Sequence, residues 1–320
     1  MVSLYLCSED GAGKTMLCAG LGRYLLNEGK KVSFLKVNLG KAGHEDPSFL
    51  KQTLSLDEPL EHLSPRLTGG DLKGELKKAL SRVSSGKDVV LIEGGEPDGG
   101  SLELAEALGA WVITIEPYSK NLSATLHNRA QVFGERLFGV VVNKVPFKQL
   151  SLVKDMVSEA GVNILGVLPE DRLLLSLTVE EVASCVGGKI IGEARGTEEL
   201  VENFMLGAMY VGSGLEYFSL KANKAALLRC ERPDMQLAAL ETETRCLLLT
   251  GAGEPLPAVL SRARDKGVPI IRVQGDITSV VSSLESALGR TKFIQEKKLP
   301  HLSRLLEEHF DFQALKKIID

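Results

Sequence analysis

The chain has 320 residues, of which 44% are hydrophobic and 25% are charged, and its formal net charge at pH 7 is -4. This composition is typical of a folded globular protein and excludes a largely disordered chain. The acidic balance argues against nucleic acid as the main partner, because phosphate backbones require a basic surface. The length favours about two domains.

The sequence also argues against secretion and membrane insertion. A strand pattern begins almost at the first residue, without the basic region and apolar stretch of a signal peptide. No apolar run approaches the roughly 20 residues that a membrane-spanning helix needs. The five cysteines form no C-x-x-C pair, and an odd number does not suit a disulfide framework. We therefore expect a soluble, cytoplasmic protein with reduced, mostly buried thiols and no membrane partner.

A glycine-rich loop stands near the start of the chain, between a predicted strand at residues 4–7 and a predicted helix from Lys14 to about Asn27. The loop reads Ser8-Glu9-Asp10-Gly11-Ala12-Gly13-Lys14-Thr15. A strand, a glycine-rich loop closed by Lys-Thr, and a helix, in that order, indicate a phosphate-binding P-loop. The strict pattern would place a first glycine at position 8, where this chain has serine.

The residues of this loop match the chemistry of a nucleoside triphosphate. Gly11 and Gly13, on either side of Ala12, let the backbone turn its N–H groups toward phosphate oxygens. The following helix directs its positive end at the same anion. Lys14 can reach the β and γ phosphates, and the Thr15 hydroxyl can bind Mg²⁺, which takes few protein ligands. The loop therefore predicts a nucleoside triphosphate bound together with Mg²⁺.

A second pattern recurs along the chain: an amphipathic stretch, a glycine, and then a short run rich in β-branched residues. The runs are residues 32–35, 89–92, 111–115, 137–143, 164–167 and 269–273. Helices that end at glycine and alternate with short strands indicate parallel βαβ units. Apolar runs that do not alternate with polar residues are typical of strands covered on both faces. We therefore predict an α/β protein built on parallel sheets.

A break at residues 186–189, Val-Gly-Gly-Lys, divides the predicted elements. We expect a parallel-sheet P-loop domain over residues 1–185, a smaller α/β domain over 190–290 and a helical tail over 291–320. The smaller domain has predicted strands at 225–228, 246–250 and 269–273. The tail carries an apolar stripe of Leu302, Leu305, Leu306 and Phe310. Such stripes usually face a core, so we expect packing against the protein itself, with a partner-binding helix as the alternative.

The first domain resembles dethiobiotin synthetase and the dethiobiotin-synthetase-like N-terminal domain of long bacterial phosphate acetyltransferases. The loop of that family also lacks the first glycine. The matching segments are Lys36-Val37, Asp88-Val89-Val90-Leu91-Ile92-Glu93-Gly94-Gly95, Gly139-Val140-Val141-Val142-Asn143 and Leu168-Pro169. The chain departs from the family pattern where a proline after Lys36 is missing and where Glu9-Asp10 precede the glycines.

The resemblance implies roles for four further residues. Glu93 matches an acidic residue near the metal and phosphates, and Asn143 matches the asparagine that recognises adenine. Asp46 lies where the family has an acidic Mg²⁺ ligand, although a solvated loop aspartate is the alternative. Lys36 matches a catalytic lysine, together with Lys14. Because the substrate-holding segments differ most, we expect nucleotide binding to carry over and the synthetase reaction not to.

The second half resembles the DRTGG domain of phosphate acetyltransferases and of other regulatory proteins. The matching segments are Asn203–Met209, Leu215–Phe218, Glu231–Glu241 and Leu249–Pro255. In phosphate acetyltransferases the catalytic domain would follow this module, whereas the present sequence ends at Asp320. Arg232 and Asp234 either shape a pocket or cap a turn around Pro233. His44 is more typical of a surface residue than of a metal ligand.

These observations support one leading hypothesis and three competing ones. The leading hypothesis is an ATP- and Mg²⁺-binding protein, with slow ATP hydrolysis as its activity, whose DRTGG module regulates or dimerises it. The second is an ATP-dependent ligase of the dethiobiotin or cobyrinic acid diamide class. Phosphate acetyltransferase activity and a scaffold with a decayed loop are the remaining two. We expect nucleotide, an unidentified small molecule at the DRTGG module and a second copy of the chain as partners.

Overall fold

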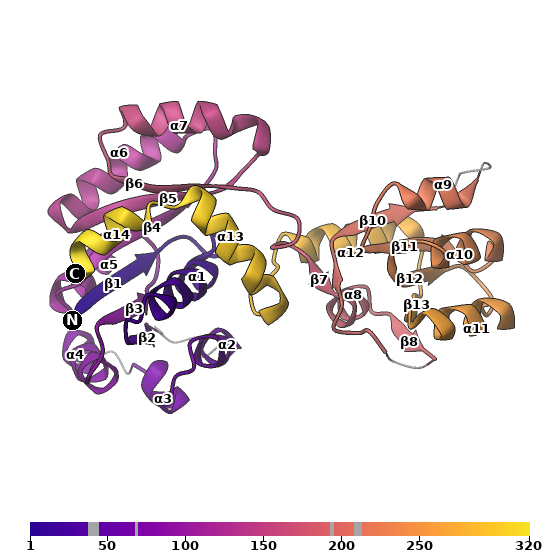
Figure 1. The fold of residues 1–320 in the computed structure, drawn as a ribbon, viewed down its shortest axis with the longest axis horizontal. Coiled ribbons are helices and arrows are strands. Elements are labelled where there is room, and N and C mark those ends of the chain that lie inside the picture. The colour runs from indigo at the N-terminus through magenta and orange to yellow at the C-terminus, as the bar shows by residue number, and fades with distance from the viewer. Residues whose placement is uncertain (38–44, 68–69, 193–194, 208–212) are drawn as a thin grey trace. The chain divides into compact units, whose positions relative to one another are not determined.

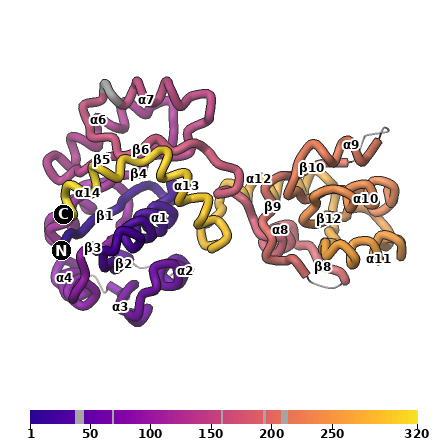
Figure 2. The backbone as a smooth tube through the Cα atoms, in the orientation of Figure 1, coloured from indigo at the N-terminus to yellow at the C-terminus, as the bar shows by residue number. Residues whose placement is uncertain are grey.

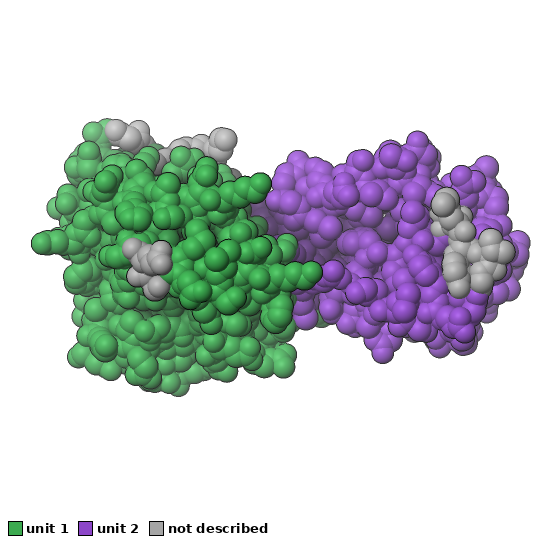
Figure 3. All heavy atoms as spheres, turned by 90° about the horizontal axis from the view of Figure 1, so that it is seen from above, with its two compact units in different colours: residues 1–171, 293–320 green, residues 172–292 purple. Residues whose placement is uncertain are grey.

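The computed structural model describes residues 1–37, 45–67, 70–192, 195–207 and 213–320. The chain forms two compact units, shown in separate colours in Figure 3. Unit 1 contains residues 1–171 and 293–320, and unit 2 contains residues 172–292. In sequence, unit 2 is therefore an insertion between the last strand of unit 1 and its C-terminal helices.

The observed unit boundary differs from the expected break at residues 186–189. Strand β7 (Leu177–Thr178) pairs with β9 (Leu200–Val201), and helix α8 (Val179–Cys185) follows it. Val179 and Val182 of this helix are buried in a core that also contains Ala225 of unit 2. The first elements after residue 171 thus fold with the second domain, and a Gly-Gly pair inside that domain does not separate two cores.

Unit 1 is built on a six-stranded parallel sheet in the order β2-β3-β1-β4-β5-β6 (Figure 1). The strands are β1 (Val2–Cys7), β2 (Val32–Lys36), β3 (Val89–Glu93), β4 (Trp111–Pro117), β5 (Leu137–Val145) and β6 (Ile164–Pro169). Every strand predicted before residue 170 lies inside one of them. The predicted parallel α/β fold is confirmed.

Helices cover both faces of this sheet (Figure 1). They are α1 (Lys14–Asn27), α2 (Glu45–Thr53), α3 (Leu60–Leu63), α4 (Leu72–Val83), α5 (Gly99–Ala107), α6 (Leu122–Phe133), α7 (Leu150–Glu159), α13 (Leu299–His309) and α14 (Phe312–Ile319). Short 3-10 turns occur at Gly134–Arg136, Phe147–Gln149 and Glu296–Lys298. The connections through α4, α5, α6 and α7 each lead from one strand to another that lies nearer the β6 edge of the sheet. The connection through α1 leads in the opposite direction, from β1 to β2. Right-handed crossovers therefore place α1 on the opposite face.

The C-terminal helices pack on the face that carries α1. Leu302 and Leu306 are almost fully buried, and a Cβ atom on Gly20 of α1 would lie only 3.3 Å from Leu302 Cδ2. Phe312 stacks on Tyr24 with ring centroids 3.6 Å apart. The two chain termini consequently lie close together at unit 1 (Figure 2). The predicted packing of the tail against the protein itself is confirmed.

Unit 2 has a five-stranded sheet in the order β10-β11-β12-β13-β8, in which only β8 is antiparallel to its neighbour. Its strands are β8 (Lys189–Ile191), β10 (Asn203–Leu206), β11 (Lys224–Arg229), β12 (Thr244–Thr250) and β13 (Ile270–Arg272). Besides α8, its helices are α9 (Gly214–Ser219), α10 (Pro233–Leu240), α11 (Pro257–Lys266) and α12 (Ile277–Leu288). Separate apolar cores cover the two faces of the sheet.

Two further sequence expectations concern membranes and thiols. Across the described ranges, no helix is both long and apolar enough to cross a membrane.

All five cysteines are free thiols and four of them are buried, as expected. Burial raises the pKa of the Cys7 thiol, directly before the glycine-rich loop, and of the Cys18 thiol in α1. Both thiols are therefore protonated and unreactive at neutral pH.

Candidate nucleotide-binding site

The glycine-rich loop lies where the sheet changes its direction of winding. From β1 the chain crosses to β2 on one side, and from β3 it crosses past β1 to β4 on the other. Ligands of open parallel sheets bind outside the carboxyl ends of the strands at such a point. The loop follows β1 directly at that edge, so the strand order independently supports the site that the motif predicts.

The loop backbone leaves amide groups available for an anion. Gly11 and Gly13 have φ angles of 76° and 111°, in the region that favours glycine. Gly13 is the N-cap of α1, and no side chain caps the helix there. The first N–H groups of a helix need an external acceptor when no cap is present. The start of α1 is thus suited to phosphate oxygens.

Two side chains fix the shape of the loop. Lys14 turns back over it and donates from Nζ to the Ser8 carbonyl at 2.8 Å. Near the end of β5, Asn143 Nδ2 donates to the Ala12 carbonyl at 2.8 Å, and its Oδ1 accepts from Lys144 N at 2.8 Å. A Cβ atom on Gly13 would lie 2.6 Å from Asn143 Nδ2. Glycine is therefore required at position 13 for close approach as well as for its φ angle.

The structure brings the other predicted site residues together at the ends of β2 and β3. Glu93 ends β3 and is only 3% exposed. The Thr15 hydroxyl lies 3.4 Å from both of its carboxylate oxygens. Lys36 ends β2 and donates from Nζ to Asp46 Oδ2 at 2.6 Å and to Glu93 Oε1 at 3.0 Å. Lys36 thus joins two acidic side chains that come from different elements.

Burial and charge act in opposite directions on this cluster. Burial raises the pKa of Glu93, and the nearby Lys36 opposes that rise only in part. Burial alone would lower the pKa of Lys36, but the ion pairs with Glu93 and Asp46 outweigh it and raise that pKa. Lys36 therefore keeps its positive charge although it is largely removed from water.

Sequence reasoning missed a largely buried ion pair beside this site. Arg129 of α6 donates from Nε and Nη2 to the Glu116 carboxylate at 2.7 and 3.2 Å, and from Nη1 to the Pro97 carbonyl at 3.0 Å. Pro97 belongs to the segment that follows Glu93. The same segment meets the glycine-rich loop, because Ser8 N donates to the Gly95 carbonyl at 3.1 Å. A glutamate near the end of an apolar strand is a sequence signal, but no sequence pattern predicts that Arg129 of the following helix is its partner.

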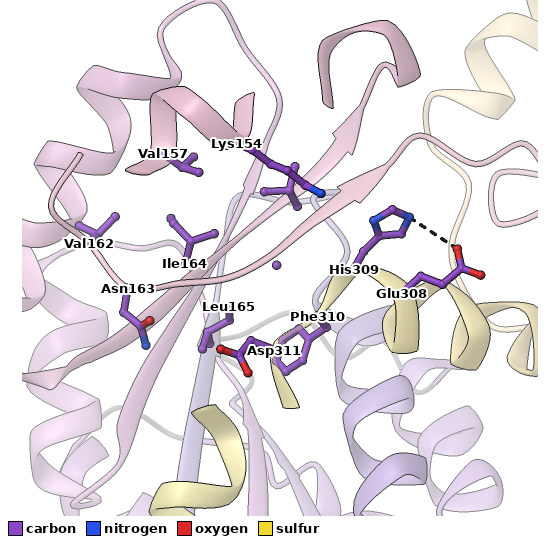
Figure 4. Close-up of a pocket in the computed structure, with 12 residues that line it drawn as sticks. Lys154, Val157, Val162, Asn163, Ile164, Leu165, Glu308, His309, Phe310 and Asp311 are labelled. Carbon is purple, nitrogen blue, oxygen red and sulfur yellow. Dashed lines mark ion pairs between the residues drawn. The ribbon is translucent and has the colours of Figure 1, made fainter. Parts of the chain in front are cut away.

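The remaining sequence candidates do not join the site. His44 lies outside the described residues. Arg232 and Asp234 pair with each other at the start of α10 in unit 2, with Nη2 2.8 Å from Oδ2, and no side-chain hydrogen bond caps this helix. A hollow of about 560 Å³ opens at the outer side of β6, where Lys154, Ile164, His309 and Phe310 are among its lining residues (Figure 4). None of the residues of the glycine-rich loop lines it.

Comparisons with known proteins match both halves of the chain. The model of the CobQ/CobB/MinD/ParA nucleotide binding domain matches residues 8–181, and that of the DRTGG domain matches residues 181–287. The phosphate acetyltransferase of Nitratidesulfovibrio vulgaris (strain Hildenborough) is 22% identical over 362 aligned positions, which cover 98% of this chain and 51% of the relative. The chain thus spans about half the length of that relative.

Two solved structures from Aquifex aeolicus are similar to part of the chain. They are the MinC:MinD cell division protein complex, with 18% identity and a TM-score of 0.42, and the MinD cell division protein, with 16% identity and a TM-score of 0.39. Each match covers 55% of this chain and 84% of the other. The predicted resemblance to the first two regions of phosphate acetyltransferase is confirmed, whereas the specific resemblance to dethiobiotin synthetase stays a prediction. Because the nucleotide-binding model matches more than half of its residues, the chain belongs to the CobQ/CobB/MinD/ParA nucleotide binding domain family, and it carries a DRTGG domain in addition.

Proposed function

We propose that unit 1 binds ATP with Mg²⁺ at the glycine-rich loop and hydrolyses it slowly, and that unit 2 regulates or dimerises the protein. The observation that carries this proposal is the convergence of Lys14, Thr15 and Glu93 at the carboxyl ends of β1 and β3. A cationic side chain, a hydroxyl and a buried carboxylate at a free helix start are the parts of a phosphoryl-transfer site.

The donor set fits Mg²⁺. Mg²⁺ prefers oxygen ligands and is usually held by one or two carboxylates together with substrate phosphates and water. Thr15, Glu93 and Asp46 supply one hydroxyl and two carboxylates. Within the part of the chain that the structure describes, no group of three or more His, Cys, Asp or Glu side chains could hold a metal by itself. Water and phosphate oxygens would complete the coordination of Mg²⁺ at this site, so bound nucleotide would strengthen metal binding there.

The protein side chains would act mainly by position and charge. The Lys14 ammonium, with the loop amides, would neutralise charge on the phosphate oxygens. Bound Mg²⁺ would add positive charge where the phosphoryl group is transferred. Thr15, Glu93 and Asp46 would orient it, and the tie from Asn143 to Ala12 would keep the loop in shape.

Asn143 is also our candidate for the adenine contact. Its Oδ1 and one Nδ2 hydrogen are engaged with Lys144 N and the Ala12 carbonyl. A side-chain amide has two N–H groups, so the second one is left for the base. We propose that Asn143 holds the loop and offers this second donor to adenine. Competition between ATP and GTP for the loop measures how far this donor discriminates between the bases.

The decisive test of ATP binding is a titration of the wild-type protein and of Lys14→Ala. We expect the variant to bind ATP at least tenfold more weakly, because a charge-assisted contact to phosphate is lost. Lys87→Met is the matched control, since it also removes a lysine from an ion pair of unit 1, with Glu58 at 2.8 Å. Equal affinity for ATP in the wild type and Lys14→Ala would remove the proposal.

For unit 2, the DRTGG match supports a regulatory or dimerisation role, with an unidentified small molecule as its ligand. We expect a homo-oligomer in solution, and sedimentation equilibrium of the full chain measures its mass. A monomer at all concentrations would leave regulation as the only role of this unit in the proposal.

A second candidate function is an ATP-dependent ligase that activates a carboxylate. The observation that favours it is Lys36, whose ammonium lies within 3.0 Å of Glu93, beside the Thr15 hydroxyl. A lysine at this place could bind a substrate carboxylate or the transferred phosphoryl group. ADP release measured over a panel of carboxylates separates the candidates. A ligase requires stimulation by one of them, and equal release with every carboxylate supports the slow ATPase instead.

A further inference from the structure

Lys36 fills the space between the two carboxylates that our proposed function assigns to Mg²⁺. Its Nζ lies 2.6 Å from Asp46 Oδ2 and 3.0 Å from Glu93 Oε1. The Lys36 and Asp46 side chains are 15% and 21% exposed, and that of Glu93 is 4% exposed. These are the distances of charge-assisted hydrogen bonds, so both carboxylates hold the Lys36 ammonium in place.

A cation at this position has a physical reason. Two carboxylates that face one space repel each other, and removal of charge from water is costly unless an opposite charge is close. Among the described residues that contact Glu93, Lys36 is the cation with a direct ion pair to it. Thr15 contributes only a neutral hydroxyl. The Lys36 ammonium therefore neutralises the two carboxylates, as a bound metal ion would.

We infer that Lys36 and Mg²⁺ are alternative occupants of this position, so that metal binding must displace the Lys36 ammonium from Glu93 and Asp46. The inference rests on the proposed function for the identity of the metal. Two cations cannot share the same pair of carboxylate oxygens, because their mutual repulsion is large at such a distance in a largely buried site. Without nucleotide, Lys36 therefore lowers the affinity of the site for the metal.

The displaced lysine gains a new partner when nucleotide is present. Lys36 ends β2 at the same sheet edge as the glycine-rich loop, and its carboxylate partner Glu93 lies beside Thr15 in that loop. The strongest free anion at this edge would be the terminal phosphate. The Lys36 ammonium thus neutralises the Glu93 and Asp46 carboxylates before the metal binds, and it contacts the terminal phosphate afterwards. This makes Lys36 a positioning residue that couples metal binding to nucleotide binding.

Binding of Mn²⁺ alone, without nucleotide, tests the exchange directly. Free Mn²⁺ is measured by electron paramagnetic resonance during titration of the wild type, Lys36→Met, Lys36→Gln and Lys36→Arg. We expect Lys36→Met and Lys36→Gln to bind Mn²⁺ at least tenfold more tightly than the wild type, because the competing charge is gone. Lys36→Arg keeps a cation and should bind as weakly as the wild type. Lys87→Met, which breaks the ion pair with Glu58, is the control for lysine removal elsewhere and should also match the wild type.

The opposite result is equally clear. If folded Lys36→Met or folded Lys36→Gln binds Mn²⁺ no more tightly than the wild type, the exchange is wrong. A second measurement uses the wild type alone and so does not depend on the folding of a variant. Trace acetylation by acetic anhydride, followed by peptide mass spectrometry, should label Lys36 several times faster, relative to Lys87, when Mg²⁺ is saturating. An unchanged ratio overturns the inference.

These results separate the inference from the proposed function. Neither measurement contains nucleotide, so a failure of ATP binding does not alter them. Conversely, Mn²⁺ affinities that are equal in the wild type and the Lys36 variants leave binding of ATP at the loop intact.

Discussion

Single residues at the glycine-rich loop act through backbone geometry as much as through charge. Gly13 illustrates this, because its φ of 111° is strained for any other residue and the Asn143 amide occupies the space of a Cβ atom. Sequence analysis identified Gly13 from the motif, but only the structure shows which side chain requires it.

We predict that Gly13→Ala reduces ATP affinity at least tenfold, because the loop must shift away from Asn143. Gly29→Ala is the matched control. Gly29 also has a positive φ, of 77°, but nothing lies within 4 Å of an added Cβ. It should retain wild-type affinity and lower the free energy of unfolding by about 1–2 kcal/mol. Calorimetric titration with ATP measures both variants, and unchanged affinity in Gly13→Ala would contradict this role of the loop.

The Glu116–Arg129 pair should matter for stability. The Glu116 side chain is buried and that of Arg129 is mostly removed from water, with 3% and 12% exposure, so removing Arg129 leaves a buried carboxylate without compensation. We predict that Arg129→Met lowers the free energy of unfolding by about 3–5 kcal/mol, and that adding Glu116→Gln recovers part of the loss. Arg262→Met, in the exposed pair with Glu241, should have far less effect. Similar denaturant midpoints for the two arginine variants would show that burial of the pair is unimportant.

Lys224 gives unit 2 a dependence on pH. It is fully buried at the start of β11 and donates to Thr242 Oγ1 and to the Glu243 carbonyl at 2.8 and 3.0 Å. Burial lowers its pKa from 10.5 to about 8. Between these values the unfolded chain binds more protons than the folded one, so this residue makes stability rise with pH from about 8 to about 10.5.

The measurement is denaturant unfolding of the wild type and Lys224→Met from pH 7 to 10.5. Subtracting the two curves removes the contribution of the thiols. We predict that the stability of the wild type relative to the variant rises above pH 8, by at most about 1.4 kcal/mol per pH unit. A flat difference across this range would mean that Lys224 titrates near its ordinary pKa.

At the scale of elements, apolar runs and glycines predicted the strands and α1 well. Strands buried on both faces carry their signal in a few consecutive residues, and α1 begins at Lys14, as the motif requires. The strand order could not be predicted, because it depends on which crossover passes over which strand. The contact of Lys36 with Glu93 follows from that order, because the two residues pair across β2 and β3, and so it appears only in the structure.

The C-terminal helix α13 should behave as part of the core of unit 1. Leu302 is fully buried against α1 near Gly20. We predict that Leu302→Ala lowers the free energy of unfolding by about 2–5 kcal/mol, the usual cost of truncating a buried leucine. Leu220→Ala is the control, since that leucine is 70% exposed. Equal small effects in thermal unfolding would show that α13 is not a structural part of the unit.

At the scale of the whole molecule, the chain inserts unit 2 between β6 and α13 of unit 1. The sequence suggested two successive domains and a tail, because local patterns do not reveal that a segment returns to an earlier core. The family models agree with the two folds. Because unit 2 is inserted, residues 293–320 return to the nucleotide-binding unit and form part of it.

The measurement that tests our central claim most directly is ATP titration of the full chain with Mg²⁺ and with EDTA, for the wild type and Thr15→Val. We predict that the wild type binds ATP in both conditions and at least tenfold more tightly with Mg²⁺. Thr15→Val should keep the affinity in EDTA and lose most of the gain from Mg²⁺, because a metal ligand is removed and Lys14 remains. Absence of ATP binding by the wild type, or an equal gain from Mg²⁺ in Thr15→Val, would contradict a magnesium–nucleotide site at this loop.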